Sequence, residues 1–191
     1  MTAPSGAPSG VEAEARHGFA SSLSADEFKA LFRGHPGGVA VITADAGDGP
    51  VALTATSVVS VSAEPPLLIF SISTLSSSSD VLARAETVVV HLLDANDIEV
   101  AKLGAARGVD RFAQEQGWSR LATGEPVYDG VRAWVRCAVI DRMDAGTSTV
   151  IAAHALESGF GRELGAGDAG DALVYHNRTW HRLSDRSRID A

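Results

Sequence analysis

Short β-rich segments, separated by short turn-forming stretches, follow one another along most of this sequence. Strands of this length with such short connections pair antiparallel, because a parallel crossover needs a dozen or more residues. A hairpin is expected at the turn DAGDGP, residues 45–50, and a corner at Ala63–Pro66, where the prolines cannot donate ladder hydrogen bonds. The expected strands are residues 37–44, 51–62, 66–73, 87–93, 131–143, 148–157 and a hairpin through 172–183.

Only a few short helices interrupt this pattern. Ser24 and Glu27 have capping-box spacing, which predicts a helix over 25–33 that presents Phe28, Leu31 and Phe32 to the core. Further short helices are expected near 80–86 and, capped by Asp94, over 95–105, and residues 108–129 are expected to form a long loop with a short helical piece. The fold class is therefore mainly β with minor α. A closed or partly open antiparallel barrel is the economical way to protect the strand edges.

Composition sets the domain organisation and excludes several classes of function. We expect a flexible N-terminal tail over 1–22, one domain over 23–184 and a C-terminal tail over 185–191. The net charge of −8 argues against nucleic acid as the main partner, and no apolar run is long enough to span a membrane. The N-terminus lacks the features of a secretory signal, and the single cysteine, Cys137, excludes an internal disulfide. These features favour a reducing cytoplasm.

Familiar catalytic motifs are missing or lack their structural context. GAGDAG, residues 165–170, matches a dinucleotide fingerprint in letters, but a strand rather than a helix follows it. The histidines show no helical metal-binding pair, and no nucleophile elbow is present. His91 continues an apolar strand and is interpreted as a core or interface histidine, whereas His154 lies mid-strand, where it can point into a pocket.

The stretch VALTATSVVSVSAEPPLLIFSI, residues 51–72, is unusually rich in hydroxyls. Thr54, Thr56, Ser60 and Ser62 share one parity of the expected strand. Two interpretations remain open. The strand is half exposed, since Thr favours strands, or it lines a flat ligand whose polar edge meets the backbone. A second serine cluster at 76–79 suits an anionic group, so the second interpretation suggests a planar heterocycle that carries a phosphate.

The order of these segments resembles the flavin reductase-like family of split barrels. The resemblance rests on the block T-x-x-S-x-x-S-V-S-x-x-P-P-L from Thr54, followed by the serine cluster, VVVHLL, DRF at 110–112, EPVYDGVRAWVRC and the closing LVYH. It covers about residues 28–183. It implies an FMN- or FAD-binding antiparallel split β-barrel that acts as an NAD(P)H:flavin oxidoreductase and supplies reduced flavin to a partner monooxygenase.

Carried over position by position, the resemblance implies a flavin site. The ring would lie against Thr54, Ala55, Thr56 and Ser57, with Ser60, Val61 and Ser71 close by, and the phosphate would meet Ser76, Ser77 and Ser78, together with Arg111 and Phe112. An exposed ion pair with Asp110 or Glu115 is an equal alternative for Arg111. His154 is a tentative nicotinamide contact. The resemblance implies no protein catalytic residue and no metal.

The chain departs from the family pattern at two places. Ser77 stands where members often carry a basic residue, and Gly146-Thr147-Ser148 replaces a Gly-Asp-His motif near the nicotinamide. The alternatives are therefore a split-barrel protein that keeps FMN as a prosthetic group for another reaction, or a non-catalytic flavin-binding protein. The resemblance also implies a homodimer. The strongly apolar strand 87–93 also favours a homodimer if it needs another surface to cover it.

Overall fold

The computed structural model describes residues 22–113, 117–163 and 170–189, and the chain divides after His35 into two parts. In the first part the described element is helix α2 (Ala25–Arg33), with the expected capping box of Ser24 and Glu27. The helix itself is confirmed, and the expected contact of its apolar residues with the core stays a prediction. The expected tail over residues 1–22 lies almost wholly outside the described residues.

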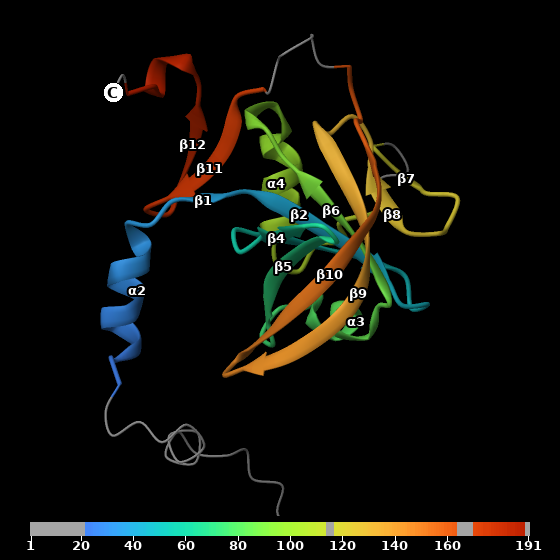
Figure 1. The fold of residues 1–191 in the computed structure, drawn as a ribbon, viewed down its shortest axis with the longest axis horizontal. Coiled ribbons are helices and arrows are strands. Elements are labelled where there is room, and N and C mark those ends of the chain that lie inside the picture. The colour runs from blue at the N-terminus through green and yellow to red at the C-terminus, as the bar shows by residue number, and fades with distance from the viewer. Residues whose placement is uncertain (1–21, 114–116, 164–169, 190–191) are drawn as a thin grey trace, which may run out of the picture. The chain divides into compact units, whose positions relative to one another are not determined.

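The second part, from Pro36 onward, is built on a seven-stranded sheet in which every pairing is antiparallel. Figure 1 shows β9 and β10 as its longest hairpin. The mainly β, antiparallel fold class is confirmed. In sheet order the strands are β3 (Pro50–Ala55), β2 (Ala40–Asp45), β6 (Thr87–Leu92), β9 (Ala133–Ala145), β10 (Ser148–Gly159), β5 (Pro66–Ser73) and β4 (Val59–Ala63).

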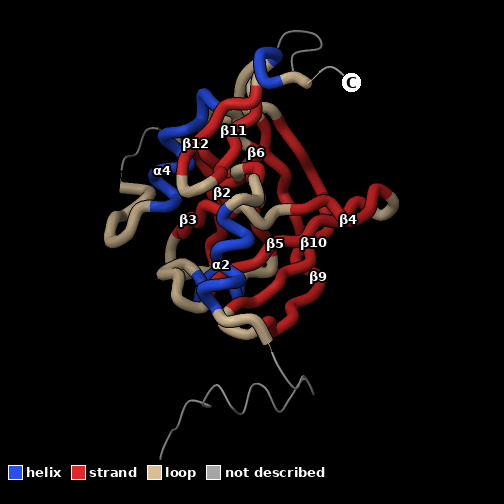
Figure 2. Tube along the Cα trace, turned by 90° about the vertical axis from the view of Figure 1, so that its left-hand side faces the viewer, coloured by secondary structure: helices blue, strands red, loops and turns tan. Residues whose placement is uncertain are grey.

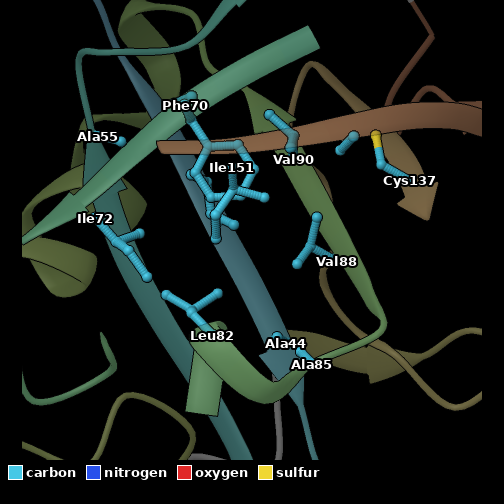
Figure 3. Close-up of a cluster of buried hydrophobic side chains, with 13 residues drawn as sticks. Ala44, Ala55, Phe70, Ile72, Leu82, Ala85, Val88, Val90, Cys137 and Ile151 are labelled. Carbon is cyan, nitrogen blue, oxygen red and sulfur yellow. The ribbon is translucent and has the colours of Figure 1, made fainter. Parts of the chain in front are cut away.

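The sheet coils so that its two ends share one core. Phe70 of β5 and Ile151 of β10 belong to the same buried cluster as Ile42 of β2 and Val90 of β6. Figure 3 shows side chains from these strands and from α3 pointing toward one another. Ala55 of β3 also joins this cluster, although β3 and β5 are far apart in the hydrogen-bonded order.

Smaller elements surround this sheet. Strands β1 (Gly37–Gly38), β11 (Ala172–His176) and β12 (Thr179–Leu183) form a second sheet, marked in Figure 2 by β11 and β12, and β7 (Trp118–Arg120) pairs with β8 (Pro126–Tyr128). The helical segments are α3 (Ser79–Arg84), η1 (Ala95–Asp97), α4 (Ile98–Ala105) and η2 (Asp185–Ser187). Helix α4 contacts β2 and β3, and α3 contacts β2 and β5. No helix within the described ranges is long and apolar enough to cross a bilayer.

Three expectations are corrected by this topology. The single strand over 51–62 is wrong, because the chain leaves the sheet after Ala55 and returns as β4 at the opposite end of the sheet order. The described parts of 108–129 contain the β7–β8 hairpin rather than a helical piece. Strand β6 needs no outside surface, because it lies between β2 and β9 with Val88, Val89 and Val90 fully buried.

Candidate active site

A pocket of about 480 Å³ lies where β3, the segment after β5 and the end of α4 come together. Its walls combine apolar contacts, serine hydroxyls and two guanidinium groups. None of the lining residues is acidic, in a chain whose net charge is −8. The lining residues are Leu53, Thr54, Ser73, Leu75, Ser76, Ser77, Gly104, Ala105, Arg107, Gly108 and Arg111.

Arg111 is anchored in this wall by hydrogen bonds to the chain itself. Its Nη2 donates to the carbonyl oxygen of Ala106 at 2.6 Å, and its Nη1 lies 3.5 Å from Oγ of Ser78. Ser78 is buried and donates in turn to the carbonyl of Ala52 at 2.8 Å. Arg111 therefore connects the end of α4 to the start of α3 and to β3. Its buried Nε has no partner within the described residues, so one donor remains available.

The alternative prediction for Arg111 was an exposed ion pair. No such ion pair joins Arg111 to Asp110. The Asp110 carboxylate accepts instead from the amide of Phe112 at 2.9 Å. The other proposed partner, Glu115, lies outside the described residues.

Arg107 is the charged residue of the pocket lining that the sequence did not point to. It lies four residues before Arg111 in the segment R-G-V-D-R, and this spacing of two arginines beside the expected flavin segment was the available signal. Arg107 is exposed, and none of the ion pairs among the described residues involves it. The pocket lining thus contains a second arginine besides Arg111. Two guanidinium groups in a pocket without an acidic lining residue suit a phosphate-like anion.

Thr54 contributes packing rather than a free hydroxyl. Its Oγ1 donates to the carbonyl of Ala101 in α4 at 2.7 Å. A Cβ built on Gly104 would clash with Oγ1 of Thr54, so only glycine allows α4 to approach β3 this closely. This contact sets the distance between two walls of the pocket.

The segment that follows β3 is joined to β5 by a side chain instead of by backbone ladder hydrogen bonds. Oγ of Ser57 accepts from the amide of Ser71 at 3.0 Å and lies 3.3 Å from the Ser71 carbonyl. The sheet pairings end at Ala55 and resume at Val59, so residues 56–58 take no part in the sheet pairing. Backbone N–H and C=O groups in such a break can bind the polar edge of a flat ring.

The structure brings only some of the predicted site residues together. Thr54, Ser76, Ser77 and Arg111 line one pocket, and Ser57 and Ser71 form the neighbouring bridge. The other predicted residues are not among those that line the pocket. Ala55 and Ser78 are buried, Thr56 is exposed, Ser60 and Val61 lie on the exposed edge strand β4, and Phe112 is a core residue stacked on Tyr128 with ring centroids 5.4 Å apart.

The expected common face of Thr54 and Ser60 is also lost. Besides the break after Ala55, a register shift at Val61 interrupts the alternation of β4. His154 is half buried on β10, where it pairs with Leu67 of β5 and Ala138 of β9, and it is not among the residues that line the pocket.

The unusual turn at 146–148 holds a segment beside the pocket. The carbonyl of Thr147 accepts two hydrogen bonds from Thr74, one from its amide and one from Oγ1, each at 3.0 Å. Thr74 lies between Ser73 and Leu75, both of which line the pocket. The tip of the β9–β10 hairpin therefore anchors the start of the serine segment.

The described residues provide neither a candidate metal site nor a reactive thiol. They contain no group of three or more His, Cys, Asp or Glu placed to hold a metal ion. Cys137 is fully buried, and burial raises the pKa of its thiol to about 12, which leaves it protonated and unreactive at neutral pH. The pocket is therefore suited to binding and positioning.

Comparison with known proteins agrees with this geometry. The family model described as "Flavin reductase like domain" matches residues 32–184. An NADH:FMN oxidoreductase of Rhodococcus qingshengii is 38% identical over 175 residues, which are 92% of this chain and 90% of that protein.

Solved structures give the same result. The crystal structure of a flavin reductase domain protein from Arthrobacter sp. FB24 aligns with a TM-score of 0.77 and 29% identity, covering 87% of this chain and 98% of the other. BorF, the flavin reductase component of a bacterial two-component tryptophan halogenase, aligns with a TM-score of 0.73 and 32% identity, over 85% of this chain and all of the other. The chain belongs to the family of flavin reductase-like domains.

Proposed function

We propose that this protein is an NAD(P)H-dependent flavin reductase that reduces FMN or FAD by hydride transfer and supplies reduced flavin to a separate monooxygenase. The observation that carries the proposal is the acid-free pocket with two arginines and serine hydroxyls beside the break in the sheet. The similar NADH:FMN oxidoreductase and the halogenase reductase component support both the reaction and the delivery of its product.

The residues present fit a flavin. The unpartnered Nε of Arg111, together with the hydroxyls of Ser76 and Ser77, provides donors for a phosphate. The unpaired segment 56–58, beside Ala55 and the Ser57–Ser71 bridge, would provide backbone groups for the polar edge of the ring. When bound, the flavin supplies the hydride-accepting chemistry.

The protein itself contributes positioning. Hydride transfer requires no protein acid or base, so the chain's task is to hold the two reactants in register and to limit access of water. The Thr54–Ala101 bond fixes α4 against β3, and the Thr74–Thr147 bonds fix the serine segment. The role of His154 as a nicotinamide contact remains a prediction, as does a contact of Ser60 or Val61 with the ring.

A homodimer is part of the proposal. Its support is a group of exposed apolar side chains on strands β4, β9 and β10, where Val59, Val61, Ile140, Met143 and Leu156 are 47–58% exposed. Exposed apolar surface of this kind is typical of association sites. Light scattering coupled to size-exclusion chromatography tests it, and a monomeric mass at micromolar concentration would contradict it.

The function is tested by following NADH and NADPH oxidation at 340 nm, with and without added FMN or FAD. We expect turnover that saturates with free flavin. A flat trace with every combination of nucleotide and flavin would overturn the proposal.

The replacement of Gly-Asp-His by Gly146-Thr147-Ser148 favours a second candidate, a protein that holds FMN as a prosthetic group for another reaction. That candidate predicts a yellow purified protein with tightly bound FMN and no dependence of NADH oxidation on added flavin. The same assay therefore separates the two functions.

A further inference from the structure

The two arginines of the pocket differ in the number of hydrogen bonds that their side chains make with the rest of the protein. Arg111 donates to Ala106 and contacts Ser78, so most of its guanidinium is committed to holding α4, α3 and β3 together. Arg107 is exposed at the pocket wall, and no hydrogen bond or ion pair joins its side chain to another described residue.

An uncommitted arginine at this position has an electrostatic consequence. The pocket contains no carboxylate to neutralise it, and the nearest acidic residue in sequence, Asp110, does not line the pocket. A guanidinium in a pocket lined by serines and a second arginine gains most from a ligand with concentrated negative charge, such as a phosphate monoester.

We infer that Arg107 is the residue that selects phosphorylated flavins over unphosphorylated riboflavin, whereas Arg111 mainly builds the pocket. The inference rests on the proposed function and deepens it by assigning the preference for a phosphate to one side chain. Since Arg107 is exposed, its contribution is screened by salt, and the selectivity falls as ionic strength rises.

The division of roles makes Arg107 the cleaner residue to test. Substitution of Arg111 removes its hydrogen bonds to Ala106 and to Ser78, so a weaker affinity there would combine lost binding with a disturbed fold. Substitution of Arg107 removes no interaction of the described structure, so its thermal midpoint is expected to stay within about 1 °C of wild type, since exposed substitutions away from structural features change stability little.

The experiment measures the Kd of FMN and of riboflavin by titration calorimetry for wild type, Arg107→Gln, Arg107→Lys and Lys102→Gln. Lys102 is the matched control, because it is an exposed cation on α4 whose partner is Glu99 and which does not line the pocket. Arg107→Gln is expected to raise the Kd of FMN roughly tenfold, the effect of one partly screened charge-assisted hydrogen bond, and to leave riboflavin unchanged. Arg107→Lys should recover part of the loss, and Lys102→Gln should bind both flavins as wild type does.

The outcomes separate this inference from the proposed function. If Arg107→Gln binds FMN as tightly as wild type, or weakens FMN and riboflavin equally, the inference is overturned while flavin reduction stands. If the wild type binds neither FMN nor riboflavin, the proposed function fails and the inference fails with it. An equal loss in Lys102→Gln would show a general effect of net charge and would also overturn the assignment to Arg107.

Discussion

Acid destabilisation of the fold is expected to begin at a buried histidine. His91 is fully buried on β6, and the ring edge meets Tyr128 with centroids 5.6 Å apart. Its Nδ1 lies 2.9 Å from the carbonyl of Val41, and its Nε2 accepts from the amide of Tyr128 at 3.0 Å. An amide donor at Nε2 requires that nitrogen to be unprotonated, so Nδ1 carries the proton and the ring is neutral.

The magnitude follows from the change in proton affinity on folding. Burial lowers the pKa of His91 from 6.5 to about 4, against the smaller opposing effects of the Val41 carbonyl and the Asp97 charge. Between these two values the unfolded chain binds a proton that the native state does not. The free energy of unfolding therefore falls as pH falls from 6.5 to 4, by about 3 kcal/mol in total, and His91 causes no further loss below pH 4. That is a large share of the stability of an ordinary domain.

The assay is urea unfolding followed by tryptophan fluorescence, from pH 7.5 down to 4, for wild type and His91→Gln. The variant is less stable at neutral pH because it disturbs a packed site, but it cannot titrate, so its stability should fall less steeply through this range. His181→Gln, at an exposed position on β12, is the control and should follow wild type. Nuclear magnetic resonance should also show His91 ring resonances that stay constant from pH 7 to 5. Equal pH dependence in wild type and His91→Gln would refute the reasoning.

Two other substitutions test how the pocket and its surroundings are held. Gly104→Ala places a methyl group against Oγ1 of Thr54, so we expect a loss of roughly 1–3 kcal/mol of stability and weaker FMN binding, measured by thermal unfolding and calorimetry; an unchanged thermal midpoint would contradict the close approach of α4 and β3. Arg162 pairs with the nearly fully buried carboxylates of Asp94 and Asp97, and Arg162→Ala leaves both without their cation. Urea unfolding should show a loss of about 3 kcal/mol or more, and a loss below about 1 kcal/mol would show that water replaces the guanidinium.

Local features of this chain were predictable because they depend on residues close in sequence. The capping box at Ser24 and Glu27, the turn at 45–50 and the alternation along 131–143 act over a few residues, and the helix and strands appear where they were expected. Four of the predicted flavin residues, Thr54, Ser76, Ser77 and Arg111, also line one pocket. The sequence order of its segments pointed correctly to the flavin reductase-like family.

Sequence patterns alone therefore predicted most of the long strands, their antiparallel pairing and the serine-rich segments, but missed the break after Ala55 and the β7–β8 hairpin. Long-range packing places β3 and β4 at opposite ends of the sheet, anchors Thr74 on the tip at Thr147, and brings Arg107 and Ser77 to the same pocket. The physical reason is that periodicity and turn propensity act along the chain, whereas the coiling of the sheet and the docking of α4 on β3 depend on packing between residues far apart in sequence.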